Sequence, residues 1–319
     1  SAQHTDHPFD GKTKPQHPRI LLPEISTLSA GSRIEFFKTR NNLYQNGPIN
    51  APSLPCNKTH LSALTTCWLA TDDPQKFDQA LELLLNFKVE TPDVSALYGN
   101  GWQLALNYDL LSSSSKITNS QHLKIQGKLE TAIIEYLRVL DEDSASLWHG
   151  RLSLSSNAWL CAVLLNADTE KRRRLVARVQ GHFLDTVQSV AITEAWPEGF
   201  NYWINNRGFY FALAASAYIN GLEDSQHADD VKQLLERIGL WHIYATRPDN
   251  KIQGYGDEGP RTDLKDETRR VLQCKTCPVL QGKTCLVLSD EACLVLQDTT
   301  RPVLQDRSCH AGQDLACLA

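Results

Sequence analysis

The chain has 319 residues and a formal charge of -5 at neutral pH. That length can bury a substantial core in one large domain or two ordinary ones. The net negative charge argues against a general nucleic-acid binder, which needs clustered Lys and Arg to neutralise phosphates. No apolar run reaches the roughly 18 residues that a membrane-spanning helix needs. We therefore expect a soluble protein with no nucleic-acid or membrane partner and of unknown oligomeric state.

The start of the chain and its cysteines bear on its compartment. The first residue is Ser1, and the sequence contains no Met, as expected of a processed export product or a fragment. We therefore expect a periplasmic or secreted protein. Only Cys56, Cys67 and Cys161 precede residue 270. Cys56 and Cys67 are expected either to form a disulfide or to remain two free thiols.

Apolar residues recur at helical spacing from residue 23 to residue 241, as in Leu129, Ile133 and Tyr136. This pattern predicts helices over residues 24–44, 60–70, 74–87, 101–111, 120–140, 153–165, 169–190, 205–219 and 228–244. Short connections favour antiparallel neighbours. The predicted fold class is all-α, an incomplete α/α toroid of antiparallel helical hairpins followed by a degenerate octapeptide-repeat tail.

We divide the chain into an N-terminal anchor (1–22), a helical domain (23–265) and a repeat tail (266–319). Most copies of the repeat carry Cys at the seventh position. The tail is expected to be a disordered extension, a frameshifted reading frame or a weak β-solenoid. Cys274 and Cys277 have the spacing of zinc ligands, but no second pair accompanies them, so we expect no metal and no cofactor.

Residues 196–203, Trp-Pro-Glu-Gly-Phe-Asn-Tyr-Trp, gather an acid, a phenol, an amide and two indoles between helical segments. Pro197 lacks an N–H to donate, and Gly199 permits unusual backbone angles. The segment is therefore predicted to form a shaped loop that leads into the next helix. Such a combination of side chains suits a bound sugar.

Four segments carry a resemblance to a known family: His-Pro-Arg-Ile-Leu-Leu at 17–22, Gly-Trp-Gln-Leu-Ala-Leu-Asn-Tyr-Asp-Leu-Leu at 101–111, Ser-Asn-Ala-Trp at 156–159 and Pro-Glu-Gly-Phe-Asn-Tyr-Trp at 197–203. Together they resemble the heparinase II/III and oligoalginate lyase group of polysaccharide lyases. The resemblance implies an α/α toroid followed by a β-sandwich. It also implies cleavage of a uronic-acid polysaccharide by β-elimination. No sandwich sequence is visible here.

By motif position, the resemblance assigns Asn157 to the substrate carboxylate and Tyr202 as proton donor or base. Ala158 stands where many members of the family have His. Elimination needs such groups, because loss of the C5 proton builds charge on the carboxylate, which amide and guanidinium donors stabilise. A phenol can protonate the departing oxygen. The other residues expected to bind substrate are Trp203, Arg207, Glu198, Trp102, His149 and Asn201.

Each assignment has a structural alternative. Asn157 would serve equally well as a helix cap, Tyr202 as a half-buried packing residue, and any single Trp as part of the core. Two other functions also remain open. One is a glycoside hydrolase with Asp109 and Glu198 as its carboxylate pair, and the other is a non-catalytic glycan-binding fragment.

Two further segments are expected to have structural roles. The basic run at 171–174 is predicted to lie on a solvated helix face. His17-Pro18-Arg19 is predicted to anchor the N-terminal segment on the helices, since proline restrains the chain and arginine offers five donors.

Overall fold

The computed structural model describes residues 9–20, 56–90, 99–142, 149–193, 207–244, 284–288 and 292–296. In this part of the chain most residues are helical and the strands are short, which confirms the predicted all-α class. The helices are α2 (Leu61–Thr71), α3 (Pro74–Leu85), α4 (Gly101–Leu111), α5 (Asn119–Glu142), α6 (His149–Ala162), α7 (Glu170–Thr193), α9 (Gly208–Gly221) and α10 (Ala228–Tyr244). The predicted helix 24–44 lies outside the described residues.

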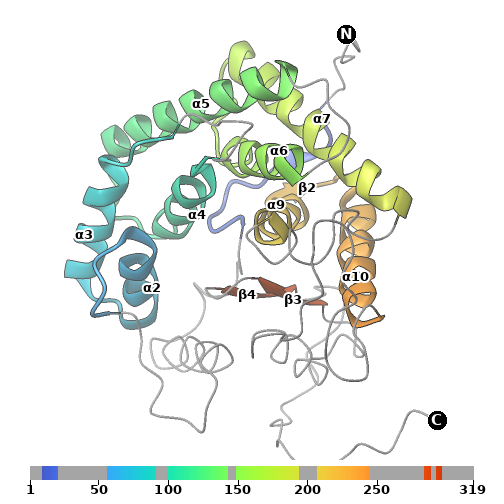
Figure 1. The fold of residues 1–319 in the computed structure, drawn as a ribbon. Helices are drawn as coiled ribbons and strands as arrows, with labels where there is room; N and C mark the ends of the chain where they lie inside the picture. Colours follow the sequence, from blue (N-terminus) through green and yellow to red (C-terminus); the bar gives the residue numbers. More distant parts are fainter. Residues whose placement is uncertain are drawn as a thin grey trace, which may run out of the picture.

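The helices form two curved layers (Figure 1). In the inner layer, α2, α4, α6 and α9 follow one another side by side, and α3, α5, α7 and α10 cover them on the outside. Each inner helix packs on the outer helix that follows it in the chain, across a short connection. The core therefore lies between the two layers. Each inner helix also contacts the next inner helix along the layer.

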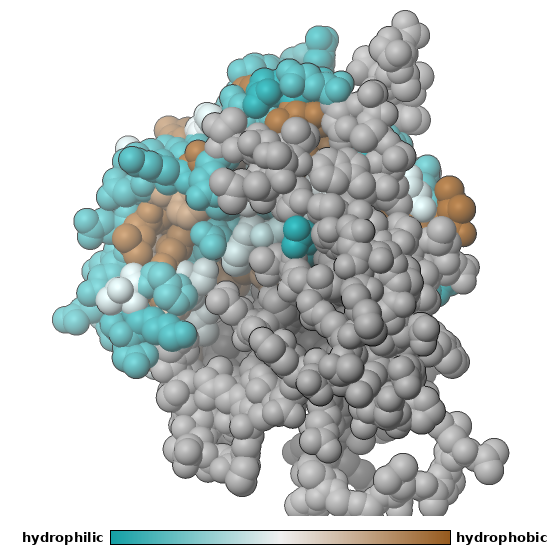
Figure 2. Space-filling view, viewed as in Figure 1, coloured by the Kyte–Doolittle hydropathy of each residue, from teal (hydrophilic) through white to brown (hydrophobic). Residues whose placement is uncertain are grey.

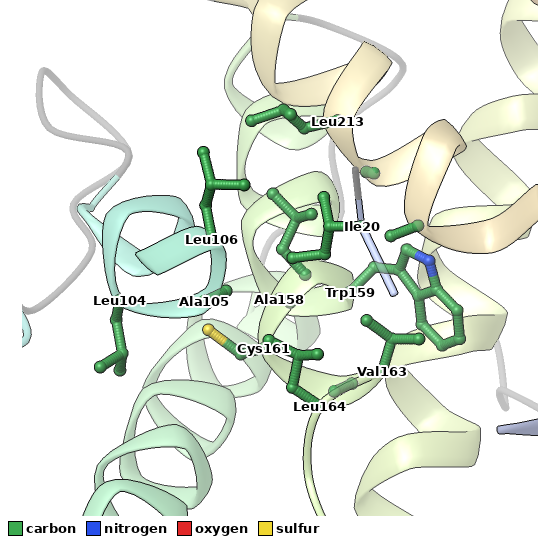
Figure 3. Packing of buried hydrophobic residues seen from close by; sticks show 14 of the residues in the cluster. Ile20, Leu104, Ala105, Leu106, Ala158, Trp159, Cys161, Val163, Leu164 and Leu213 are labelled. Atoms are coloured by element: carbon green, nitrogen blue, oxygen red, sulfur yellow. The ribbon is translucent and has the colours of Figure 1, made fainter. Parts of the chain in front are cut away.

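Figure 3 shows a part of the core to which α4, α6 and α9 contribute. The indole of Trp159 on α6 is fully buried. It stacks on Phe183, with ring centroids 6.1 Å apart, and lies against Tyr218. Trp159 therefore belongs to the core and offers no surface to a sugar.

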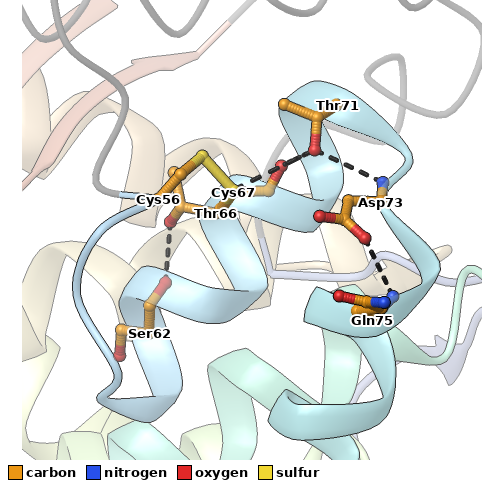
Figure 4. Close-up of a disulfide and its surroundings, with 7 residues drawn as sticks. All are labelled: Cys56, Ser62, Thr66, Cys67, Thr71, Asp73 and Gln75. Atoms are coloured by element: carbon orange, nitrogen blue, oxygen red, sulfur yellow. Dashed lines mark hydrogen bonds between the residues drawn. A yellow bond between two sulfur atoms is a disulfide. The ribbon is translucent and has the colours of Figure 1, made fainter.

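A disulfide joins Cys56, which precedes α2, to Cys67 within α2 (Figure 4). The sequence had left open whether these cysteines pair or stay free. The two are separated by 11 positions, so the bond closes a short loop at the start of α2. Disulfides persist in oxidising compartments.

Replacing both Cys56 and Cys67 with serine is expected to lower the free energy of unfolding by about 3 kcal/mol, because the unfolded chain regains the freedom of the closed loop. Urea denaturation under non-reducing conditions measures the change. Adding a reductant should destabilise the wild type to the level of the variant and leave the variant unchanged. Equal midpoints for the oxidised wild type and the variant would refute the expectation.

The N-terminal segment 9–20 is held across the helices by a buried aspartate on α4. The carboxylate of Asp109 is fully buried and accepts hydrogen bonds from the backbone N–H groups of Arg19 and Ile20, at 2.7 to 2.9 Å. It also lies 2.6 Å from Nδ1 of His17. The guanidinium of Arg19 donates to the carbonyl of Val163 at 2.9 Å. This confirms the predicted anchoring role of His17-Pro18-Arg19.

The other end of the same segment is tied to α9 and to the turn that precedes α10. The carboxylate of Asp10 accepts from the hydroxyl of Tyr218, from Oγ of Ser225 at 2.7 Å and from the N–H of Gln226 at 2.9 Å. Next to it, β1 (Lys12–Thr13) pairs antiparallel with β2 (Leu222–Glu223). Burial raises the pKa of Asp10, but these hydrogen bonds outweigh it and hold the pKa below its ordinary value.

The lowered pKa of Asp10 predicts a loss of stability in acid. A carboxyl whose pKa is depressed by folding stabilises the folded state above its ordinary pKa of about 4, and the contribution is lost as pH falls through the folded pKa. Asp10→Asn should therefore be less stable than the wild type at neutral pH, and the difference should shrink below about pH 4. Urea midpoints across pH test this, with exposed Asp78→Asn on α3 as the control. A difference independent of pH would refute it.

The basic run lies on α7 and is paired with acids. Lys171 and Arg172 contact the carboxylate of Glu130 on α5 at 2.7 and 3.0 Å. Arg173 and Arg174 contact Glu170 at 3.1 and 3.0 Å. Lys171, Arg173 and Arg174 are exposed, which confirms a solvated helix face, and the charges of the run are compensated by neighbouring carboxylates.

The surface and the tail add two observations. Figure 2 shows mostly hydrophilic residues on the described part of the viewed face, with a hydrophobic area at its left, near α3. In the tail, β3 (Thr284–Leu288) and β4 (Ala292–Leu296) form an antiparallel pair in which Val287 lies opposite Cys293. The rest of the tail lies outside the described residues, so its predicted alternatives stay open. Across the described ranges no helix is long and apolar enough to cross a membrane.

Candidate functional site

The structure places only part of the predicted site. Asn157, Trp102 and Arg207 are described, whereas the side chain of His149, at the start of α6, is not. Four more predicted residues lie outside the described part of the chain: Tyr202, Trp203, Glu198 and Asn201. The role predicted for Tyr202 therefore stays a prediction.

The described site residues meet at the start of α4. The amide oxygen of Asn157 on α6 accepts a hydrogen bond from the backbone N–H of Trp102 at 2.8 Å. The indole of Trp102 is part-exposed. It packs edge-on against Phe209, with ring centroids 4.9 Å apart, and lies 6.0 Å from Tyr210. Arg207 immediately precedes α9, the helix that carries Phe209 and Tyr210.

The first turn of α4 is capped by side chains of other helices. The residue at its N-cap position, Asn100, makes no side-chain bond to its own helix. Its amide instead bridges the carbonyl of Lys88 and the N–H of Glu90, both at 3.0 Å. The N–H of Gly101 donates to the hydroxyl of Tyr136 on α5 at 3.0 Å. The backbone position of Trp102 is thus set by α5 and α6.

Gly101 lies against Tyr136 with no room for a side chain. A Cβ atom at residue 101 would come within 2.8 Å of the Tyr136 ring. Burial raises the pKa of Tyr136 well above its ordinary value. Burial likewise raises the pKa of the neighbouring Cys161 to about 12. Both groups stay neutral near neutral pH and act as structural partners of α4 rather than as nucleophiles.

Gly101→Ala is expected to destabilise the fold by about 1–3 kcal/mol, because the added methyl overpacks a site closed by a buried ring. Gly127→Ala on α5 is the matched control, since nothing lies within 4 Å of its added Cβ. Alanine there should stabilise the protein by up to about 1 kcal/mol through helix propensity. Thermal denaturation of both variants gives the comparison, and equal shifts of the same sign would contradict the expectation.

Asn157 does not present its amide to solvent, which corrects the expected direct contact with a substrate carboxylate. Its side chain is fully buried in the middle of α6. The amide nitrogen donates to the carbonyl of Ser153 at 2.9 Å, while the oxygen holds Trp102. The capping alternative is closer to the structure, although Asn157 caps α4 and not its own helix.

Asp109 is equally unavailable to a substrate, which corrects its place in the alternative glycosidase pair with Glu198. The fully buried carboxylate already accepts from two backbone N–H groups and lies against His17. A glycosidase acid or nucleophile must reach the glycosidic bond. The sequence signal for this structural role was a lone carboxylate among the apolar residues of 104–111, since a buried charge needs partners.

One Asp–His pair lies away from this site. Nε2 of His182 on α7 lies 3.2 Å from Oδ1 of Asp141, and Nδ1 lies 3.2 Å from Nη2 of Arg151. Because a guanidinium only donates, Nδ1 of His182 must accept and Nε2 carries the proton. The histidine is 1 % exposed, so both nitrogens serve to join α5, α6 and α7.

The described residues contain no group of three or more His, Cys, Asp or Glu side chains that could hold a metal ion. Comparison of the sequence with family models and with curated proteins finds no match.

Proposed function

We propose that the protein is a polysaccharide lyase, or the helical domain of one, that cleaves a uronic-acid-containing glycan by β-elimination. The observation that carries the proposal is the part-exposed indole of Trp102, held against Phe209 and Tyr210. An aromatic face of this kind can stack on a sugar ring. The segment that precedes α9 in the sequence contains an acid, an amide and a phenol.

The scaffold of the proposed enzyme is an α/α toroid. The two curved layers, with α2, α4, α6 and α9 inside, support this interpretation (Figure 1). The disulfide between Cys56 and Cys67 supports a periplasmic or secreted location, because such bonds persist in oxidising compartments.

In the proposed reaction Tyr202 donates its phenolic proton to the leaving oxygen. A base removes the C5 proton beside the uronate carboxylate, the C4–oxygen bond breaks, and the departing oxygen takes a proton from the phenol. Arg207 offsets the charge that develops on the carboxylate. Trp102 and Trp203 stack on sugar rings, and Glu198, Asn201 and His149 complete the substrate contacts.

The proposal is tested by the products formed from alginate and from a heparin-type glycosaminoglycan. Elimination creates a C4–C5 double bond, so ultraviolet absorbance should rise as either polymer is cleaved. A neutral glucan, which lacks the carboxylate, is the control and should give no rise. New reducing ends without the absorbance, or no cleavage of any acidic glycan, would contradict the proposal.

A non-catalytic glycan-binding protein is the second candidate. The burial of Asn157 favours it, because the amide assigned to the substrate carboxylate is occupied within the protein. Calorimetry that shows tight binding of oligouronates, together with no change in their length, would support this candidate over the lyase.

A further inference from the structure

The start of α4 depends on other helices for each of its first two backbone donors. The N–H of Gly101 is satisfied by Tyr136 on α5, and the N–H of Trp102 by Asn157 on α6. A local N-cap would move with its own helix. Caps from two neighbouring helices instead fix where the first turn of α4 lies relative to α5 and α6.

The first turn of α4 carries Trp102, whose indole is part-exposed. Trp102 is the residue whose N–H Asn157 accepts, and its indole contacts Phe209 and Tyr210 on α9. Asn157 is itself locked by its bond to the carbonyl of Ser153, one turn earlier in α6. A displacement of the Asn157 amide would therefore pass directly to the backbone of Trp102.

We propose that Asn157 is a positioning residue, which acts on glycan binding through Trp102 and does not touch the glycan. The inference rests on the proposed function, since it assigns the aromatic surface of Trp102 to the sugar. It predicts that the losses of glycan affinity caused by substituting Asn157 and Trp102 are not additive. Once the indole of Trp102 is removed, the amide of Asn157 no longer positions a glycan-binding group.

The test is a double-mutant cycle with a tetrasaccharide of alginate as the probe, read by calorimetry. Asn157→Ala should weaken binding about tenfold, the usual effect of losing one buried hydrogen bond. Trp102→Ala should weaken it at least as much, and adding Asn157→Ala to that variant should change nothing further. Ser155→Ala, which removes a different buried hydrogen bond of α6 and leaves the bond to Trp102, is the matched control and should bind as the wild type does. Independent, additive losses would overturn the proposal, because they would mean that the amide contacts the sugar itself.

A ligand-free measurement separates this proposal from the proposed function. With fluorinated tryptophan, the fluorine resonance of Trp102 is assigned by its disappearance in Trp102→Phe. Asn157→Ala should shift that resonance most among the seven tryptophans of the chain. An unshifted Trp102 resonance would overturn the positioning role. A shifted one would support it even if no acidic glycan binds, in which case only the proposed function fails.

Asn157→Asp serves as the conservative variant if the alanine variant does not fold. It keeps an oxygen that accepts from Trp102, replaces the donor to Ser153 and brings a carboxyl group into a buried site, so its Trp102 resonance reports whether the cap is kept. Wild-type Trp102 resonance with wild-type binding would support the proposal. Wild-type resonance with lost binding would overturn it.

Discussion

Asp109→Asn is expected to lower the free energy of unfolding by about 3–5 kcal/mol, the usual cost of breaking a buried charged network. The wild-type carboxylate accepts from the N–H groups of Arg19 and Ile20 and lies against His17. Asparagine keeps one acceptor oxygen but turns an NH₂ group toward backbone donors, which leaves at least one buried N–H without a partner. The N-terminal segment should then detach from α4.

Two measurements test the loss of stability expected for Asp109→Asn. Urea denaturation gives its size, with Asp168→Asn as the matched control, because its exposed ion pair with Arg172 is worth at most about 1 kcal/mol. Limited proteolysis should cut the variant within residues 9–20 faster than the wild type. A loss below about 1 kcal/mol, with unchanged proteolysis, would mean that Asp109 is not the anchor.

Tyr202→Phe is expected to reduce the rate of elimination by about 10²–10⁴-fold, the usual contribution of a general acid or base. Phenylalanine keeps the aromatic ring and removes only the hydroxyl, which is the proposed proton donor. The effect should appear in kcat, with KM little changed, because the transferred proton matters in the transition state rather than in the bound ground state.

The control for this variant is Tyr210→Phe, which keeps the ring beside Trp102 and removes a different phenol. It should retain a rate within a few-fold of the wild type, since its ring packs beside Trp102 and its hydroxyl has no part in the proposed reaction. Full activity in Tyr202→Phe would exclude Tyr202 as the proton donor. Equal losses in both variants would point to a structural effect.

Helix positions followed closely from the sequence where apolar spacing and local signals agree. α4 and α10 have the predicted bounds, and α3 begins at Pro74 behind the N-cap Asp73. α6 begins at His149, before the predicted start at Ser153. Serine is typical of helix starts, but Ser153 and Ser155 both lie inside this helix. The hydroxyl of Ser155 bonds back to the carbonyl of Leu152, so burial between the layers overrides the local preference.

The site was less predictable because its contacts join residues far apart in the chain. The sequence selected Trp102, Asn157 and Arg207, and the structure brings Trp102 and Asn157 into contact. It could not show that the amide of Asn157 faces a backbone N–H, since that depends on how α4 packs on α6. Tyr136 was predicted only as a core residue, and its role at Gly101 follows from the same packing.

The most direct test of the lyase proposal is cleavage of alginate in water labelled with heavy oxygen, followed by mass spectrometry of the products. Elimination breaks the glycosidic bond without adding water, so products analysed before their anomeric oxygen exchanges with the solvent should contain no labelled oxygen, and each new non-reducing end should be unsaturated. One labelled oxygen incorporated per bond cleaved, with saturated ends, would show hydrolysis and contradict the proposal.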